Sequence, residues 1–399
     1  MATGTDWIVV GNGLAGAALS YELQKQGLSV LLLQAATPSQ ATRYSYGGIA
    51  YWSGSTLLMR QLCQEGIDLH RQLSAELEAD TEFRELDLLL TVAPDADLAE
   101  AAASYAQVAI PPQTLTPAEA VDLEPLLNPA AIAGALRLPH GHVSPEATIA
   151  AYNSAFQRLG GQIQLDEVTG FQGQGERVVG VTTRQGNYGA AAVVVCAGAL
   201  SRQLLKQSGV PTRLYFTQAE LIETEPVAVQ LRSLVMPARL QRFELEAKAG
   251  SSEQDARWNQ PGQEILSPIL DPGVVQLQDG RLRIGQLTRV TSDLEPEVDA
   301  MASELALRQA IGTVLPSLQS LPGRWCRCQV AFRGDRLPLL GSCRQGLHLF
   351  TGFSNPFAIL PPLARRYARA VVGSGGEMGR WGDGEVGEMG RWGDGGVGR

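Results

Sequence analysis

Three glycines near the N-terminus are spaced as Gly11-x-Gly13-x-x-Gly16, between an apolar run at 7–10 and a segment with helical periodicity. In such a turn the first glycine allows the tight bend from strand to helix, and the second lets a pyrophosphate approach the backbone. The third lets helix and strand pack closely, while the helix N-terminus offers free N–H groups to the phosphates. This spacing predicts that the chain binds a dinucleotide.

The elements that must position these glycines are those of a βαβ unit. A second apolar run at 29–33 follows the expected helix, and Gln34 stands directly after it, where an Asp or Glu normally accepts the ribose hydroxyls. A Gln carbonyl can still accept one hydrogen bond, so we interpret Gln34 as a weakened variant of that ligand. The alternative interpretation is a glycine-rich turn in another kind of α/β protein.

Length and composition narrow the classes of function. The 399 residues are enough for two domains, and a formal net charge of −9 gives a nucleic-acid partner no general electrostatic support. The first strand begins almost at the N-terminus and no apolar run reaches about 18 residues, so we expect neither a signal peptide nor a membrane span. Five scattered cysteines without zinc-like spacing favour a reduced, cytoplasmic chain that holds no metal. The oligomeric state stays open.

The C-terminal residues differ in kind from the rest. Residues 377–387 recur almost unchanged as 388–398, and glycine dominates both copies. Such a segment cannot bury enough apolar surface to offset its ordering entropy, so we predict that 374–399 is a disordered tail. Trp381 and Trp392 leave open the alternative that the repeat docks onto a surface.

The apolar periodicity predicts strand–helix alternation near both termini and a strand-rich middle. Thr116, Pro117 and Glu119 form a helix start, with an N-cap Thr, a Pro at the first position and a Glu at the third. Helices are also expected at 57–79, 145–159, 305–315 and 359–372, and strands at 85–92, 162–165, 178–183, 192–196, 214–223, 274–277, 282–287, 325–332 and 347–351. This order indicates a nucleotide-binding domain with a second sheet inserted into it.

Eight short motifs follow one another along the chain. They are Gly11-x-Gly13-x-x-Gly16, Tyr46-Gly-Gly-Ile49, Asp122-Leu-Glu-Pro-Leu-Leu127, Val143-Ser-Pro145, Val193-Val-Val-Cys-Ala-Gly198, Asp279-Gly-Arg-Leu-Arg-Ile-Gly285, Asp335-x-x-Pro338-x-x-Gly341 and Leu349-Phe-Thr-Gly352. In this order they resemble the FAD-dependent oxidoreductases of the D-amino-acid oxidase, glycine oxidase and sarcosine oxidase superfamily. The resemblance covers residues 5–373.

The resemblance implies an α/β fold in which a Rossmann-like FAD-binding domain is interleaved with an α+β substrate domain built on a mixed β-sheet. The FAD-binding domain would comprise 1–90, 147–213 and 324–373, and the substrate domain 91–146 and 214–323. The implied reaction oxidises a C–N bond of a small amine or of an amino or imino acid, by hydride transfer to flavin N5. Electrons would pass to O2 or, in a dehydrogenase, to a carrier. A flavin-binding protein with an assembly or regulatory role is the non-enzymatic alternative.

The resemblance also implies which residues hold the flavin and the substrate. The implied FAD ligands are Gly11, Gly13, Leu14, Ala15, Gly16, Gln34, Ala35, Thr42, Arg43, Gly47, Gly48, Ile49, Val168, Ala197, Gly198, Gly352, Phe353, Ser354, Asn355, Pro356, Phe357 and Ala358. The implied substrate-side residues are Arg333, Tyr46, Trp52 and Asn355. The four histidines are interpreted as structural or surface residues.

Three positions depart from the family's pattern. One is Gln34, described above, and another is the segment after Gly352, where Asn355 and Phe357 stand in the places in which some members carry another carboxylate-binding arginine and a glycine next to the flavin. The third lies before Asp335. Members that oxidise amino acids carry an arginine shortly before the Asp of the Asp-x-x-Pro motif, where it binds the substrate carboxylate. An ungapped count from Asp335 gives Val330, and Arg333 takes that place only if a short deletion precedes the motif. Both alignments stay open. Cys328 stands where sarcosine oxidases with a covalent flavin carry their cysteine, although we interpret it as a buried, inert thiol.

Overall fold

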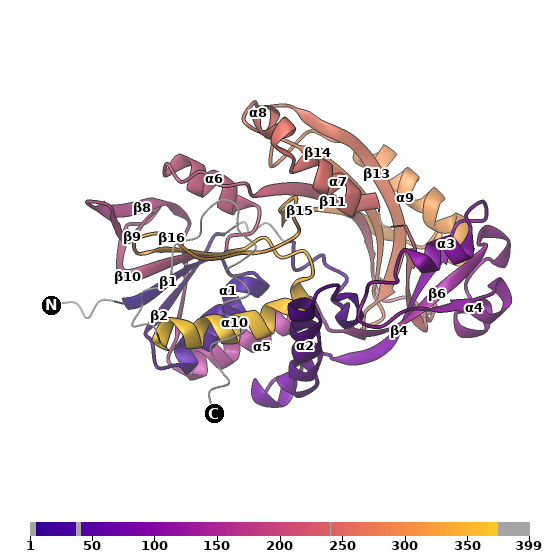
Figure 1. The fold of residues 1–399 in the computed structure, drawn as a ribbon, viewed down its shortest axis with the longest axis horizontal. Helices are drawn as coiled ribbons and strands as arrows, with labels where there is room; N and C mark the ends of the chain where they lie inside the picture. Colours follow the sequence, from indigo (N-terminus) through magenta and orange to yellow (C-terminus); the bar gives the residue numbers. More distant parts are fainter. Residues whose placement is uncertain (1–4, 37–40, 240, 374–399) are drawn as a thin grey trace.

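In the computed structural model, which describes residues 5–36, 41–239 and 241–373, the chain forms two β-sheets (Figure 1). The first, the parallel sheet, has a parallel core in the order β17-β10-β1-β2-β7, with β16, β9 and β8 joined to it antiparallel. Its strands are β1 (Thr5–Val10), β2 (Val30–Gln34), β7 (Gln162–Leu165), β8 (Val168–Gln174), β9 (Arg177–Thr183), β10 (Asn187–Val195), β16 (Leu339–Arg344) and β17 (Leu347–Thr351).

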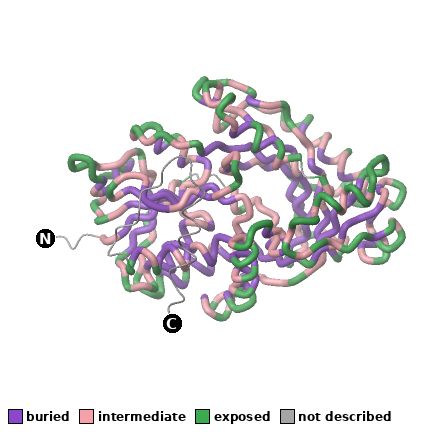
Figure 2. The backbone as a smooth tube through the Cα atoms, viewed as in Figure 1, coloured by how far each residue is buried: buried purple, intermediate pink, exposed green. Residues whose placement is uncertain are grey.

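Helices cover this sheet and explain the apolar runs of its central strands, which are buried on both faces. One face packs against α1, α5 and α10, and the other packs against β9 and α6. Figure 2 shows the buried backbone concentrated in the strands of both sheets and in these helices. The helices are α1 (Leu14–Lys25), α2 (Leu57–Glu76), α5 (Pro145–Arg158), α6 (Leu200–Gln207) and α10 (Pro356–Gly373).

The second sheet, the mixed sheet, has nine strands in the order β15-β11-β14-β13-β12-β4-β6-β3, with β5 paired to β6. It is mixed because β12 and β4 run parallel and the other pairs run antiparallel. Its strands are β3 (Gly48–Ile49), β4 (Arg84–Val92), β5 (Gln113–Leu115), β6 (Gly134–His142), β11 (Tyr215–Thr224), β12 (Ser233–Pro237), β13 (Glu264–Gln276), β14 (Leu282–Thr291) and β15 (Gly323–Phe332). The predicted α/β fold with a mixed second sheet is confirmed.

The remaining helices lie on the side of the mixed sheet. The predicted helix start is confirmed, because Thr116 and Glu119 form a reciprocal capping box. None of the helices within the described residues is long and apolar enough to cross a membrane. The α-helices are α3 (Leu98–Ala103), α4 (Pro117–Leu123), α7 (Gln241–Ala249), α8 (Asp255–Trp258) and α9 (Ala300–Val314), and short 3₁₀ helices lie at Tyr51–Ser53, Pro129–Ala131, Ser252–Gln254 and Pro316–Leu318.

Some predicted bounds differ from the structure. No strand is predicted between 92 and 162, but the structure has the strand β6 there, which pairs with β4 along its whole length despite Pro139 and Gly141. The closing helix begins at Pro356, before the predicted start at Ile359, and it continues through Pro361 and Pro362. The residue bounds of the two domains stay a prediction, since β4 begins within the expected FAD-binding segment 1–90 and pairs in the mixed sheet. The predicted tail 374–399 lies outside the described residues.

Candidate cofactor and substrate site

A single cavity of about 1940 Å³ extends from the glycine turn of the parallel sheet to the inner face of the mixed sheet. Gly11, Gly13 and Gln34 line its first end, and residues of β11, β12 and β15 line the other. The loop 41–46 and the segment 351–357 form walls between the two ends. This arrangement gives room for a long ligand that reaches both sheets.

The glycine turn has the shape expected of a phosphate cradle. Gly11 has a φ of +104°, and a Cβ on Gly16 would lie 1.7 Å from the carbonyl oxygen of Gly11. A Cβ on Gly13 would meet only the Thr42 hydroxyl, at 3.4 Å. The N-cap residue of α1, Gly13, has no side chain, the first turn has no acidic residue, and the Leu14 N–H donates to Thr42 Oγ1 at 3.3 Å. Gly13, Leu14 and Ala15 line the cavity, so the positive end of α1 faces it. These features fit the pyrophosphate of FAD.

The adenosine end departs from what the sequence predicts for Gln34. Its Oε1 atom accepts a hydrogen bond from Asn12 Nδ2 at 2.8 Å, so its carbonyl is already engaged by a neighbouring side chain. Asn12 also lines the cavity, and its own Oδ1 atom is buried without a partner among the described residues. Asn12, which sequence reasoning missed, therefore joins Gln34 as a candidate group for the ribose hydroxyls.

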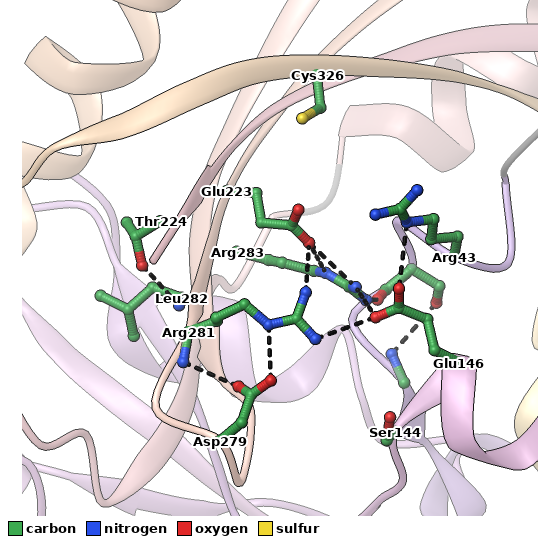
Figure 3. Close-up of polar contacts among 12 residues, drawn as sticks. Arg43, Ser144, Glu146, Glu223, Thr224, Asp279, Arg281, Leu282, Arg283 and Cys326 are labelled. Carbon is green, nitrogen blue, oxygen red and sulfur yellow. Dashed lines mark hydrogen bonds and ion pairs between the residues drawn. The ribbon is translucent and has the colours of Figure 1, made fainter. Parts of the chain in front are cut away.

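A charge cluster around the buried Arg283 and Glu223 holds the loop that would contact the flavin (Figure 3). Arg283, which is fully buried, donates to the carbonyl oxygen of Ser45 at 2.6 Å and pairs with Glu223 and Glu146, both at 3.2 Å. Arg43 Nε reaches the same Glu146 at 3.1 Å. The cluster consists of Arg43, Glu146, Glu223, Asp279, Arg281, Arg283 and Arg324.

The electrostatics of this cluster keep its central carboxylate charged. Burial alone would raise the pKa of Glu223, but the neighbouring guanidinium groups, Arg324 first and then Arg283, outweigh burial and lower its pKa. The cluster connects the loop 43–45, helix α5 and strands β11, β14 and β15. Arg43 is the one member among the implied FAD ligands. Asp279, Arg281 and Arg283 lie in a motif that carries the resemblance, but their role in the cluster was not predicted, because ion pairs between distant segments leave no local signal in the sequence.

The aromatic side chains predicted near the substrate are held by hydrogen bonds. Tyr46 donates its hydroxyl to the carbonyl oxygen of Gly273 at 3.0 Å, and burial raises its pKa, so the phenol stays neutral. Trp52 Nε1 donates to His140 Nδ1 at 3.2 Å, which leaves the ring proton of His140 on Nε2. Burial lowers the pKa of His140 to about 3, so this ring is neutral as well. All three line the cavity.

The segment after β17 is fixed at its turn into α10. Asn355 Nδ2 donates to the carbonyl oxygen of Ala50 at 3.3 Å and to Ser53 Oγ at 3.1 Å. His70 Nε2 is 2.8 Å from the carbonyl oxygen of Phe357 and donates to it, and burial lowers the pKa of His70 to about 4. Asn355 is therefore occupied in joining this segment to the 3₁₀ helix at Tyr51–Ser53.

Most of the implied FAD ligands line the cavity, and a few do not. The lining includes Gly11, Gly13, Leu14, Ala15, Gln34, Ala35, Thr42, Arg43, Gly48, Val168, Ala197, Gly198, Gly352, Phe353, Ser354, Asn355, Pro356 and Phe357. Four implied residues support the lining from behind and do not form it: Gly16, Gly47, Ile49 and Ala358. Within residues 5–36, 41–239 and 241–373, no group of three or more His, Cys, Asp or Glu is placed to hold a metal ion.

The structure does not bring Arg333 into the cavity. Its guanidinium forms a two-point pair with Asp335, with Nε to Oδ1 at 3.0 Å and Nη2 to Oδ2 at 2.6 Å. Val330 and Cys328, on β15, line the wall instead. Arg333 follows the end of β15 at Phe332, and its pair with Asp335 holds the guanidinium outside the cavity lining. Burial raises the pKa of the Cys328 thiol to about 12, which disfavours a reactive thiolate.

Residues 6–370 match the family described as FAD dependent oxidoreductase (DAO). A 4-methylaminobutanoate oxidase (formaldehyde-forming) of Paenarthrobacter nicotinovorans is 30% identical over 214 residues, which cover 52% of this chain and 26% of the oxidase. A glycine oxidase of Geobacillus kaustophilus (strain HTA426) is 29% identical over 230 residues, or 54% of this chain and 60% of that enzyme. The matched segments thus span less than two thirds of either relative.

Solved structures show the same fold. The crystal structure of glycine oxidase from Geobacillus kaustophilus has a TM-score of 0.76 at 22% identity, covering 96% of this chain and 97% of that one. L-proline dehydrogenase from P. horikoshii has a TM-score of 0.71 at 18% identity, with 94% and 95% covered. Because the family match runs through both sheets, from residue 6 to residue 370, the chain belongs to the FAD dependent oxidoreductase (DAO) family.

Proposed function

We propose that this chain oxidises a C–N bond of a small amine, amino acid or imino acid by loss of hydride from the carbon next to nitrogen. The observation that carries the proposal is the single cavity that joins the glycine turn to an apolar chamber at the mixed sheet. Relatives named as oxidases of 4-methylaminobutanoate and of glycine support the amine class. The cytoplasmic location predicted from the cysteines stays a prediction.

The residues that would hold FAD are those of the cavity wall described above. Gly13 and the N-terminus of α1 would bind the pyrophosphate, Asn12 and Gln34 the ribose, and the walls 42–48 and 352–357 the ring. When bound, FAD supplies the acceptor for the electron pair and hydrogen that leave the substrate carbon.

The chain itself favours the neutral form of the amine, because the part of the cavity at the mixed sheet is apolar. Its wall is largely apolar at the mixed sheet, with Leu88, Leu90, Ala219, Leu221, Leu234 and Val330. A protonated amine loses its hydration in such a place, which lowers the pKa of the amine and favours the neutral form. The neutral form is the one that can release hydride, because its nitrogen lone pair stabilises the carbon centre that is left. The neutral His140 and Tyr46 add no opposing charge.

Anaerobic mixing of the FAD-loaded protein with single amines tests this proposal. We expect at least one small amine to bleach the flavin absorbance, with one oxidised product for each flavin. Protein that dithionite bleaches but no amine bleaches would contradict it and favour the assembly or regulatory alternative. Peroxide formed on admitting air would indicate an oxidase, and reoxidation only by an added carrier would indicate a dehydrogenase.

A further inference from the structure

The carboxylate side chains that line the cavity differ in what balances their charge. Asp166 and Glu167 follow β7, in the parallel sheet. Asp335 is paired with Arg333 at 2.6 Å. Asp271, on β13 of the mixed sheet, forms no ion pair with any Lys, Arg or His within residues 5–36, 41–239 and 241–373. Among these lining carboxylates, Asp271 is therefore the one at the mixed sheet that is left for a cationic ligand.

The carboxylate of Asp271 is held firmly but keeps room for a ligand. Its residue is 6% exposed, and α7 lies beside β13 (Figure 1). Oδ1 accepts the backbone N–H of Gln241 at 3.3 Å, and Oδ2 accepts that of Arg242 at 3.1 Å. A carboxylate has about four acceptor sites, so roughly two remain for a donor in the cavity.

A second polar group lies next to Asp271 without a partner. The register of β13 against β14 shifts between Leu270 and Gly273, and Gly273 pairs with the residue directly before Gln286. Asp271 and Gln286 therefore face the same stretch of the cavity wall from adjacent strands. Gln286 Nε2 is buried and has no hydrogen-bond partner within the part of the chain that the structure describes. A buried amide without a partner costs free energy, which a polar ligand at this place would recover.

The electrostatics place Asp271 near the loop that would contact the flavin ring. Burial first, and then the charge of Asp271, raise the pKa of Tyr46, which lies on that loop. Burial also raises the pKa of the Asp271 carboxyl, although the backbone N–H groups and the charge of Arg242 act against it. A carboxylate in this environment takes up a proton more readily than one in water.

We propose that Asp271 binds the ammonium group of the reacting amine and takes one of its protons before hydride leaves the neighbouring carbon. This inference rests on the proposed function and names the residue that prepares the substrate. An N–H bond of the ammonium breaks as an O–H bond forms on Asp271, and the nitrogen keeps the electron pair. In the apolar part of the cavity, a neutral amine and a neutral carboxyl replace two charges that have lost their hydration.

Binding of a cation that cannot react tests the first half of this inference without turnover. tert-Butylammonium has no hydrogen on the carbon bound to nitrogen, and tert-butanol is its neutral analogue. Calorimetry with the FAD-loaded protein gives both dissociation constants. We expect the wild type to bind the cation more tightly than the alcohol. Asp271→Asn should weaken binding of the cation by about tenfold to a hundredfold and leave the alcohol unchanged, since a charge-assisted hydrogen bond is lost.

Two further variants separate recognition from the contact with α7. Asp97 likewise accepts two backbone N–H groups at the start of a helix, at 2.7 and 3.0 Å, but it is exposed and lies outside the cavity lining. Asp97→Asn should change neither dissociation constant. Asp271→Ser keeps a hydroxyl that can accept an N–H of α7, so it should fold and still lose binding of the cation. A wild type that binds tert-butylammonium no better than tert-butanol would overturn the inference.

The pH dependence of flavin bleaching tests the proton transfer. The second-order rate constant is measured anaerobically between pH 7 and pH 9, with an amine whose own pKa is about 10. The wild type binds the ammonium form, so its rate constant should be nearly constant over this range. Asp271→Asn must draw on the neutral amine in solution, so its rate constant should rise about tenfold per pH unit. A rate constant for Asp271→Asn as flat as that of the wild type would show that Asp271 takes no proton. Failure of every amine to bleach the flavin, with binding of the cation still dependent on Asp271, would count against the proposed function instead.

Discussion

Gly13 and Gly16 belong to one motif, but their neighbours give them different tasks. A Cβ on Gly16 would collide with the carbonyl oxygen of Gly11 at 1.7 Å, so this glycine is required for the helix and strand to pack. A Cβ on Gly13 would come no closer than 3.4 Å to the Thr42 hydroxyl, so the protein itself leaves this space open. The motif thus contains one glycine needed by the fold and one needed by the ligand.

We therefore expect Gly13→Val to fold as an apoprotein with little change in melting temperature and to lose FAD, because the side chain would occupy the pyrophosphate path. Gly16→Ala should lower the melting temperature of the apoprotein itself. Flavin content after purification and thermal unfolding of the apoproteins measure both effects. Normal flavin content in Gly13→Val would show that the glycine turn does not bind the cofactor.

Arg283 is the member of the charge cluster that donates a hydrogen bond to the backbone of the loop 43–45. Because it is fully buried beside Glu223, Arg283→Met should cost about 3 kcal/mol or more of the free energy of unfolding and loosen Ser45. The matched variant Arg324→Met removes a partner of the same Glu223 whose side chain is 60% exposed, and it should cost at most about 1 kcal/mol. Denaturant unfolding and the dissociation constant of FAD compare the two variants. Equal effects would mean that burial does not decide the strength of these pairs.

At the scale of elements, the crossing of α2 and α10 positions the segment that would contact the flavin ring. A Cβ on Gly66 of α2 would lie 1.8 Å from the carbonyl oxygen of Ala358 on α10. Gly66→Ala should therefore push the start of α10 outward, lower the melting temperature and weaken FAD binding at the same time. Ala75→Gly, on the same helix away from this crossing, controls for a change in helix propensity alone. A Gly66→Ala protein with wild-type FAD affinity would show that the crossing does not position the segment.

The elements predicted from sequence are those whose signal is local. The βαβ unit and the capping box of Thr116 and Glu119 follow from short patterns of apolar residues, glycine and caps. By contrast β6 has Pro139 and Gly141 in its interior and becomes a strand because β4 and β5 pair with it. Strand pairing over long sequence distances therefore overrides the local preference there.

The same distinction holds for the site. The cofactor end could be predicted because it rests on one contiguous motif and on a resemblance with fixed order. The role of Arg283 could not, since it depends on contacts with Ser45 and Glu223 from distant segments. For Arg333 the sequence left two alignments open, and the pair with Asp335 shows where its guanidinium lies.

At the scale of the whole molecule, four buried histidines link stability to pH. Burial lowers the pKa from 6.5 to about 4 for His70 and His348 and to about 3 for His140 and His142. The unfolded chain therefore binds more protons than the folded chain below pH 6.5. Stability from these groups is complete above pH 6.5 and falls as the pH drops towards 4, by up to about 1.4 kcal/mol per pH unit for each histidine.

Denaturant midpoints measured between pH 7 and pH 4 test this expectation. His70→Gln keeps a donor for the carbonyl oxygen of Phe357 but cannot titrate, so its curve should be shallower than that of the wild type. Burial raises the pKa values of Glu22 and Asp271, so these two groups act in the opposite sense and make the fall in stability with decreasing pH less steep. A wild-type midpoint independent of pH over this range would show that the histidines do not stay neutral in the folded protein.

The central claim is that the cavity between the two sheets holds FAD and an amine together, so that the amine gives up hydride there. Rapid anaerobic mixing of the FAD-loaded protein with the most active amine tests it most directly, using the amine with hydrogen and then with deuterium on the carbons bound to nitrogen. We predict that the flavin absorbance is lost in a single turnover and that deuterium clearly slows this loss. A flavin that no small amine reduces, although dithionite reduces it, would contradict the account.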